Sequence, residues 1–294
     1  MELFYKGVVT LPEQEFNDNY FMIMRVKTVL LTMCKKYDEC FETIKQVINQ
    51  GYAFPLHFER YKPLQQKHGY KNLLEQNNRL FAEINSRAKA EYEVHLPEKY
   101  DPEKKYPIFI ALHGDGVCNI KEFSQYWKPD VFLANNFIFV YIQSSQAICH
   151  NGYGWLKDLV NARRDIKECY DSIVKSYSVN ESTIFIGGFS GGAIATIDFI
   201  MSNVLPIKGF ICLCPHEKPE TFSKENVELA AARGVKGIFM EGELELPIEC
   251  EEEMLREFDE AGLCYAYYIN NGVGHRAPDD FDDKLRQALN FVLS

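Results

Sequence analysis

Short apolar runs and helical repeats alternate along residues 91–294. The runs are rich in β-branched and aromatic residues and are bounded by glycine, proline or polar residues, which is typical of strands buried on both faces of a parallel sheet. They lie at residues 108–112, 137–142, 183–186, 209–214, 237–241 and 265–269. Apolar residues recur at steps of three and four elsewhere, which predicts helices over residues 159–173, 193–201, 249–260 and 279–293. This alternation predicts an α/β fold with a mostly parallel, doubly wound sheet and helices on both of its faces.

Residues 1–90 show only helical repeats. Apolar residues recur at mostly helical spacing over 16–34, 41–48 and 73–84, while prolines and glycines break residues 51–70. An alternating pattern at 92–96 then predicts a half-exposed strand. We therefore expect an N-terminal helical extension at 1–90 and a catalytic domain at 91–294. The extension is interpreted as a packing layer, with a mobile lid or a dimer surface as the alternatives.

Composition and charge narrow the classes of partner. The chain has 294 residues, is 46% hydrophobic and carries a net charge of −10, which argues against nucleic acid or an anionic membrane as the main partner. No uninterrupted apolar stretch approaches the roughly 18 residues of a spanning helix, and the first residues do not resemble a secretory signal. The nine scattered cysteines fit free thiols in a reducing cytoplasm, and without CxxC or HExxH spacing no metal is expected.

The strongest chemical signal is the sequence Gly-Phe-Ser-Gly-Gly at residues 188–192, between a predicted strand and a predicted helix. A G-x-S-x-G pattern in strand–turn–helix context is a nucleophile elbow. The turn is so sharp that a Cβ at Gly188 or Gly192 would collide with its neighbours. Ser190 would then stand clear of the sheet at the N-terminus of a helix, where the dipole favours negative charge.

A serine nucleophile needs a base and an acid, and both follow at later strand ends. His275 lies in a glycine-containing loop after the last predicted strand. The loop after residues 237–241 offers Glu245, our choice for the acid, with Glu243 as the alternative. The order serine, acid, histidine is the one expected of this arrangement. The nearby acidic run at 249–253 is interpreted as an exposed first helical turn.

Two backbone amides are candidates for an oxyanion hole. One is the N–H of Gly191, directly after the nucleophile, and the other is the N–H of Asp115, in the loop after residues 108–112. The Asp115 carboxylate must then point away from the hole or bond a neighbouring donor. His113 in the same loop is interpreted as a brace and not as a base.

Three further residues are candidates for the substrate pocket. Tyr153 and Trp155 follow a predicted strand and are either pocket walls or core aromatics. His216 follows another strand and would line the mouth of the pocket. Residues 215–236 are too few to hold a large cap domain, so moderately small or exposed acyl groups are expected as substrates.

These motifs resemble the α/β-hydrolase superfamily. From about Ala90 onward, the opening LPEKYDPEKKYPIFIALHG is similar to small serine carboxylesterases of the phospholipase/carboxylesterase-like and prolyl-oligopeptidase-like groups. The resemblance implies a Ser190–His275–Glu245 triad, the Asp115 and Gly191 amides as oxyanion hole, and hydrolysis of a small ester through an acyl-enzyme without metal or organic cofactor. This chain departs from these relatives in having Glu as the expected triad acid, where Asp is commoner.

The resemblance leaves other activities open, and it does not reach the N-terminal residues. The alternatives are a peptidase, thioesterase or acyltransferase with the same triad, or a non-catalytic binding protein on the same fold. Residues 1–90 resemble no family.

Overall fold

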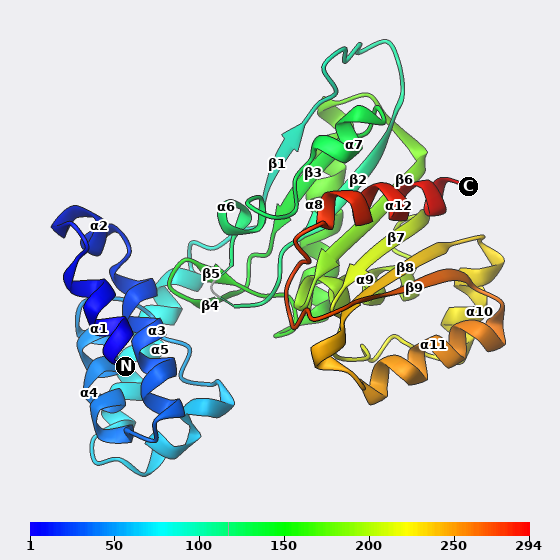
Figure 1. Cartoon of the computed structure of the whole chain (residues 1–294). Helices are drawn as coiled ribbons and strands as arrows, with labels where there is room; N and C mark the ends of the chain where they lie inside the picture. The colour runs from blue at the N-terminus through cyan, green and yellow to red at the C-terminus, as the bar shows by residue number, and fades with distance from the viewer. Residues whose placement is uncertain (117) are drawn as a thin grey trace. The chain divides into compact units, whose positions relative to one another are not determined.

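The computed structural model describes residues 1–116 and 118–294, which form two compact units (Figure 1). The first unit contains Met1–Ala88 and Ala147–Asn151, and the second contains Lys89–Gln146 and Gly152–Ser294. The chain therefore leaves the second unit after Gln146 and returns to it at Gly152. The sequence pattern did not separate this short segment from its surroundings.

The first unit is mainly helical. Its elements are α1 (Glu2–Val9), α2 (Glu13–Asp18), α3 (Tyr20–Met33), α4 (Tyr37–Asn49), the 3₁₀ helix η1 (Glu59–Gln66), α5 (Tyr70–Asn85) and strand β4 (Ala147–Cys149). The repeat at 16–34 is divided between α2 and α3, which meet at Asn19. The proline-containing stretch forms only η1, because Pro63 cannot donate a helical hydrogen bond.

A small core and two polar contacts hold the first unit together. Buried apolar side chains come from α3, α4, η1 and the loop before η1, and include Leu31, Ile44, Val47, Ile48, Phe54 and Leu64. The buried Asn77 side chain exchanges two 2.8 Å hydrogen bonds with the backbone of Phe54. The segment Ala147–Asn151 joins this core, since the His150 N–H donates to the Ala53 carbonyl at 2.9 Å and the His150 ring lies 4.6 Å from that of Tyr52.

The second unit is built on a seven-stranded sheet with the order β1-β3-β2-β6-β7-β8-β9. Its strands are β1 (Glu91–His95), β2 (Tyr106–Leu112), β3 (Ile138–Gln143), β6 (Val179–Phe189), β7 (Ile207–Leu213), β8 (Lys236–Gly242) and β9 (Cys264–Asn270). Only β1 runs antiparallel to its neighbour among these strands, and the other pairs are parallel. The short strand β5 (Gly152–Tyr153) lies outside the sheet. A mostly parallel sheet confirms the predicted fold class.

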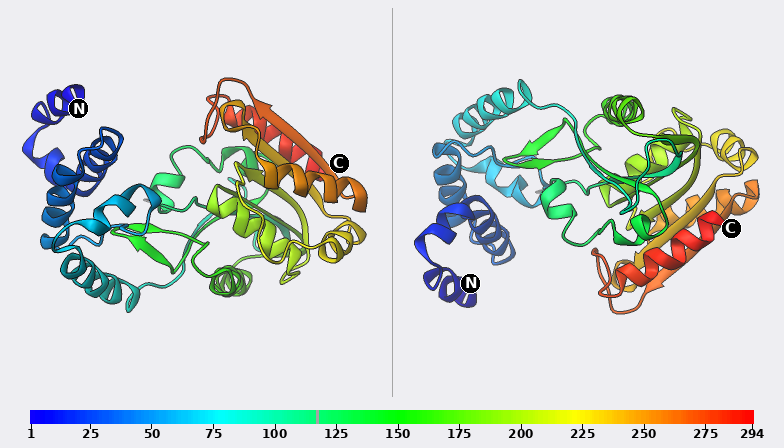
Figure 2. Two further views of the ribbon diagram at one scale, coloured as in Figure 1. Left: turned by 90° about the horizontal axis from the view of Figure 1, so that it is seen from below. Right: turned by 90° about the horizontal axis from the view of Figure 1, so that it is seen from above.

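Helices cover both faces of this sheet. One face packs against α8 (Leu159–Ser176), α9 (Gly191–Met201), α10 (Lys224–Ala232) and α11 (Glu249–Ala261). The other face packs against α6 (Ile120–Phe123), α7 (Asp130–Ala134) and α12 (Phe281–Leu293). Figure 2 shows α8 and α12 on opposite sides of the sheet. Every residue of β3 and all but one of β2 are buried, as their continuous apolar runs predict.

Two acidic side chains, one near the end of β8 and one in the first turn of α11, are buried. Glu241, near the end of β8, is fully buried, and Glu251, in the first turn of α11, is 1% exposed. The two carboxyls interact electrostatically, and the Tyr267 hydroxyl donates to Glu251 at 3.0 Å. Burial, followed by the neighbouring carboxyl, raises the pKa of Glu241, and burial raises that of Glu251. The expectation that this acidic turn is wholly exposed is therefore wrong for Glu251.

No helix in the described part of the chain is both long and apolar enough to cross a membrane.

Candidate active site

The turn after β6 places Ser190 at the carboxyl edge of the sheet. Ser190 has φ +53° and ψ −121°, and α9 begins at the next residue. A Cβ at Gly188 would lie 2.5 Å from the carbonyl carbon of Gly192, and one at Gly192 would overlap with the backbone of Leu112 and His113. Only glycine fits at both positions, so the predicted elbow is present as a packing requirement and not merely as a motif.

Ser190 lies in hydrogen-bonding contact with His275. Its Oγ is 2.8 Å from Nε2 of His275, although 85 residues separate the two in sequence. The Ser190 N–H donates to the Leu213 carbonyl at 2.8 Å, which fixes the turn on β7. The His275 ring packs at 5.1 Å on Phe189 and at 5.4 Å on His216. The contact between a hydroxyl and an imidazole nitrogen is the geometry that a nucleophile and its base require.

The loops after β8 and β9 bring an acid to the other ring nitrogen. Oε2 of Glu245 is 3.8 Å from Nδ1 of His275, which is within ion-pair range and longer than a hydrogen bond. Glu243 has a different partner, because its Oε2 accepts the Gly272 N–H at 2.8 Å. The Leu244 N–H also donates to the Val273 carbonyl at 3.0 Å. The two loops are thus tied together by backbone, with Glu245 facing the histidine.

The environment favours neutral His275. Burial lowers its pKa below the ordinary 6.5, the electrostatic interaction with His216 lowers it further, and Glu245 acts in the opposite direction. A neutral imidazole can accept the Ser190 proton, whereas an imidazolium cannot. The His275 ring is therefore in the protonation state that can accept a proton at neutral pH.

The loop after β2 lies against the start of α9. A Cβ on Gly191 would overlap with the Asp115 carboxylate, so the two residues are in contact. Within residues 1–116 and 118–294, neither the Asp115 nor the Gly191 amide donates a hydrogen bond to another protein atom. Two neighbouring unpaired N–H groups beside a serine fit the predicted pair of oxyanion donors.

The Asp115 side chain bonds neighbouring donors, one of the two arrangements expected from the sequence. Oδ1 accepts the Trp155 N–H at 2.8 Å and Oδ2 accepts the Leu156 N–H at 3.2 Å. No sequence signal identified Leu156 as a partner, because its backbone amide is what binds.

His113 braces the same loop from inside the fold. It is fully buried, its Nδ1 bonds the Gly114 carbonyl at 2.8 Å, and its Nε2 accepts the Ser144 N–H at 3.2 Å. These contacts fix the tautomer with the proton on Nδ1. Burial lowers the pKa of His113 to about 4, so the ring stays neutral and is not free to act as the base.

The three predicted pocket residues lie in different environments. Trp155 is fully buried, and its indole N–H donates to the His113 carbonyl at 2.8 Å, which favours the core interpretation. Tyr153 is half-buried, and its N–H donates to the Cys118 carbonyl at 3.1 Å. His216 is exposed and stands edge-on to His275. Of the three, His216 is the one whose side chain contacts His275.

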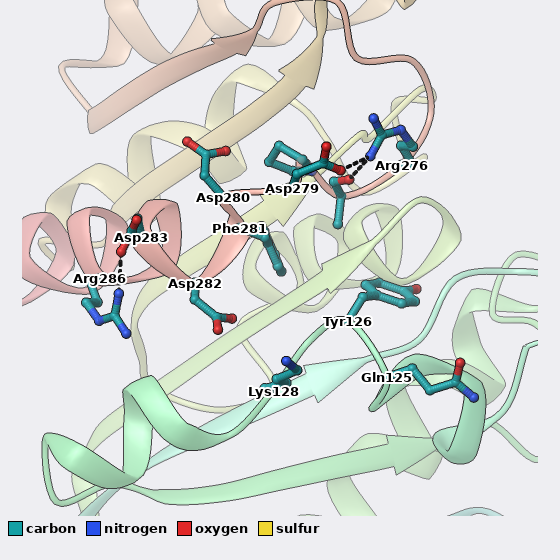
Figure 3. A pocket seen from close by; sticks show the side chains of 12 residues that line it. Gln125, Tyr126, Lys128, Arg276, Asp279, Asp280, Phe281, Asp282, Asp283 and Arg286 are labelled. Atoms are coloured by element: carbon teal, nitrogen blue, oxygen red, sulfur yellow. Dashed lines mark hydrogen bonds and ion pairs between the residues drawn. The ribbon is translucent and has the colours of Figure 1, made fainter.

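Two hollows of the second unit lie near these loops. One cavity, of about 440 Å³, is lined by residues that include Leu156, Ile194 and Glu217. Leu156 follows Trp155 in the chain, Ile194 lies in the first turn of α9, and Glu217 follows His216. A larger one of about 570 Å³ lies beyond the His275 loop and includes Arg276 and Arg286. Figure 3 shows these arginines paired with Asp279 and Asp283, so four of the charges that line this pocket neutralise one another.

Metal-ligating side chains do not gather anywhere in the described part of the chain: no group of three or more His, Cys, Asp or Glu residues there could hold an ion.

Comparisons with known proteins show the fold. No protein-family model matches the sequence, and no curated protein matches it either. An uncharacterized protein from Bacillus cereus ATCC 10987 matches with a TM-score of 0.59 at 22% identity, over 93% of this chain and 88% of that one. A Bacillus cereus carboxylesterase matches with a TM-score of 0.55 at 14% identity, over 72% of this chain and 98% of that one.

A third structure is a phospholipase/carboxylesterase from Dyadobacter fermentans DSM 18053. Its TM-score is 0.50 at 13% identity, and the match covers 70% of this chain and 97% of that one. At these identities the likeness is one of fold, and together with the sheet order and the elbow it confirms the α/β-hydrolase fold. The Bacillus cereus ATCC 10987 match covers more of this chain than the other two, so it extends into the helical unit.

Proposed function

We propose that the protein is a serine hydrolase that cleaves a carboxylic ester through an acyl-enzyme, with Ser190 as nucleophile, His275 as base and Glu245 as acid. The observation that carries the proposal is the 2.8 Å contact between Ser190 Oγ and His275 Nε2 at a strained elbow. Neighbouring folds that are named carboxylesterase support the choice of ester.

The proposed acylation half uses these atoms in the following order. Ser190 Oγ attacks the ester carbonyl carbon while its proton moves to Nε2 of His275. The carbonyl oxygen becomes an oxyanion, which accepts hydrogen bonds from the Asp115 and Gly191 amides. The bond to the alcohol oxygen then breaks, and that oxygen takes the proton from Nε2. Glu245 stabilises the imidazolium that exists between the two transfers.

Deacylation repeats the sequence with water. Water attacks the acyl carbon and gives one proton to His275 Nε2, and the second tetrahedral species collapses to release the carboxylic acid. Nε2 returns its proton to Ser190 Oγ, which restores the starting state. Every proton is moved by His275, so no further group is required for these steps.

We place the substrate beside the 440 Å³ cavity, because its lining residues adjoin the oxyanion loop, α9 and His216. A cavity of this size has room for an acyl or alcohol group of small to moderate size. His216 precedes Glu217 of this lining and stands edge-on to His275, so we expect it to contact the substrate.

Hydrolysis of p-nitrophenyl esters of increasing acyl length tests the proposal. We expect a burst of p-nitrophenol equal to the protein concentration, with short acyl chains preferred. Ser190→Ala should lower kcat by at least roughly 10³-fold, because it removes the covalent step. Wild-type activity in the Ser190→Ala protein would contradict the mechanism, and faster cleavage of thioesters or amides than of matched esters would contradict the choice of ester.

A further inference from the structure

We propose that Asp115 is a positioning residue of the oxyanion hole, whose carboxylate holds its own backbone N–H in place by gripping the backbone of Trp155 and Leu156. The inference rests on the proposed function, because it concerns the same site. It assigns a role to a carboxylate that would otherwise oppose the negative charge formed beside it.

The grip uses both carboxylate oxygens. Oδ1 accepts from the Trp155 N–H at 2.8 Å and Oδ2 from the Leu156 N–H at 3.2 Å. Two bonds from one rigid, planar group to successive amides fix the side chain in direction as well as distance. Since the side chain and the N–H belong to one residue, fixing the carboxylate restricts the amide.

The same partner segment holds the loop on either side of Asp115. The Trp155 indole N–H donates to the His113 carbonyl at 2.8 Å, and the Gly116 N–H donates to the Tyr153 carbonyl at 3.2 Å. Residues 113, 115 and 116 are thus all bonded to residues 153–156. The hydrogen bonds of the Asp115 carboxylate lie between the other two in sequence.

The carboxylate also sets the distance between the loop and the nucleophile helix. It occupies the space that a side chain on Gly191 would need. A shift of the carboxylate would therefore change the separation between the Asp115 and Gly191 amides. A displacement of about 1 Å in such a site lowers the reaction rate about 100-fold. A group that holds the two amides at the right separation therefore helps the reaction more than its negative charge opposes it.

The pKa of Asp115 lies above its ordinary value. Burial raises it to about 6, against the two backbone N–H bonds, which lower it. The titratable groups that face it are His216, whose electrostatic interaction lowers this pKa, Glu217, which raises it, and Cys118. Above pH 6 both oxygens accept hydrogen bonds. Below it, one oxygen carries a proton that opposes an N–H donor, and the grip weakens.

The first test compares variants in the full-length protein by steady-state ester hydrolysis at pH 8. Asp115→Asn keeps one acceptor and faces the other amide with an NH₂ group, so kcat should fall roughly tenfold; Asp115→Ala should lower it roughly 100-fold, the effect of losing one oxyanion donor. KM should change less than twofold. Asp101→Asn is the matched control, because Asp101 also accepts a backbone N–H, from Glu103 at 3.0 Å, before the amino end of β2. It should leave kcat unchanged.

The second test uses the pH profile, which a merely structural role would not alter. In wild type the acid limb of kcat should reflect two protons, on His275 and Asp115, and be steeper than a single titration. In Asp115→Asn it should become a single titration at lower pH. A trifluoromethyl ketone, which forms an oxyanion on Ser190, should bind the variants more weakly in proportion to kcat.

Two outcomes would overturn the inference. One is a single-proton acid limb in the wild-type protein, which needs no variant and so does not depend on variant folding. The other is an Asp115→Asn protein with wild-type kcat, or with the whole effect in KM. An inactive wild-type protein in which Ser190 does not react would instead contradict the proposed function.

Discussion

Glu245 is the member of the proposed triad whose contact is longest. Its carboxylate lies 3.8 Å from Nδ1 of His275, and its side chain is 38% exposed. Neutral His275 gains little from such a contact, whereas the imidazolium formed during acylation gains much more. The acid is therefore placed to act when charge appears on the ring.

A pair of matched variants separates the two candidate acids. Glu245→Gln should lower kcat roughly 10²- to 10⁴-fold, because the imidazolium loses its counter-charge. Glu243→Gln should lower it less than about tenfold, since Glu243 only holds the Gly272 N–H. Steady-state kinetics on one ester suffice for both, and the reverse ranking would assign the acid to Glu243.

The sequence predicts Ser190 and His275 from local patterns, whereas it favours Glu245 over Glu243 on much weaker grounds. Ser190 is marked by glycines that a tight turn requires, and His275 by the loop after the last strand. The two glutamates follow the same strand within three residues. Which of them faces the ring depends on the path of the loop against Gly272 and Val273, which no local pattern encodes.

At the scale of elements, the turn at Ser190 packs so closely against neighbouring backbone that no side chain fits between them. Gly192 faces the carbonyls of Leu112 and His113, at the end of β2. The start of α9 and the loop after β2 therefore pack backbone to backbone. We expect a change at this contact to act on stability and on the proposed catalysis together.

Gly192→Ala tests this packing. The added methyl group meets rigid backbone, so we expect a loss of roughly 1–3 kcal/mol in the free energy of unfolding and a large loss of kcat. Gly7→Ala is the control, because nothing lies within 4 Å of its new Cβ in α1. Urea unfolding should show Gly7→Ala at or slightly above wild-type stability. Equal stability of the Gly192→Ala and wild-type proteins would contradict the close packing.

The buried pair Glu241 and Glu251 joins β8 to the first turn of α11. Since folding raises the pKa of both carboxyls above the ordinary 4.5, the folded state holds a proton that the unfolded state releases. This contribution to stability is present below about pH 4.5 and is lost as pH rises toward the raised pKa values. Alkaline pH should therefore weaken the contact between β8 and α11, next to the loop that carries Glu245.

Glu241→Gln removes the charge while keeping the shape. At pH 8 it should raise the free energy of unfolding by roughly 1–3 kcal/mol, because only the Glu251 carboxyl of the pair then remains buried. At pH 5 the gain should nearly vanish. Urea titrations at the two pH values measure both, and a gain that is equal at pH 5 and pH 8 would contradict the raised pKa.

Local pattern predicted the elements that bury a face and missed those that do not. The strands β2 and β3 are continuous apolar runs and were predicted within one or two residues. The helix α1 buries no side chain, so no periodicity of apolar residues indicates it in the sequence. Glu251 was misjudged because an acidic helical turn gives no sign of a carboxyl partner on another strand.

For the whole molecule, the main surprise is that the first unit is assembled from two separate pieces of chain. The segment Ala147–Asn151 belongs with the helices, and its partners lie about a hundred residues earlier in sequence. Such a contact has no local pattern and could not be predicted. The site itself lies within the second unit, where strand ends collect it at one edge.

His150→Ala tests whether the two units are energetically separate. The change removes ring contacts with Tyr52 and Phe21, which are worth about 0.5–1.5 kcal/mol each. Hydrogen exchange of α3 and α4 amides should accelerate roughly five- to tenfold, while amides of β2 and β6 remain unchanged. Equal acceleration in all four elements would show that the chain opens as one unit.

Reaction with a fluorophosphonate, followed by intact mass and peptide mapping, examines the nucleophile without knowledge of the natural substrate. We predict one adduct per chain, on Ser190, and its loss or strong slowing in His275→Ala, because the serine there has no base. An unmodified Ser190 in the wild-type protein, or an adduct that forms equally fast without His275, would contradict an activated serine at the elbow.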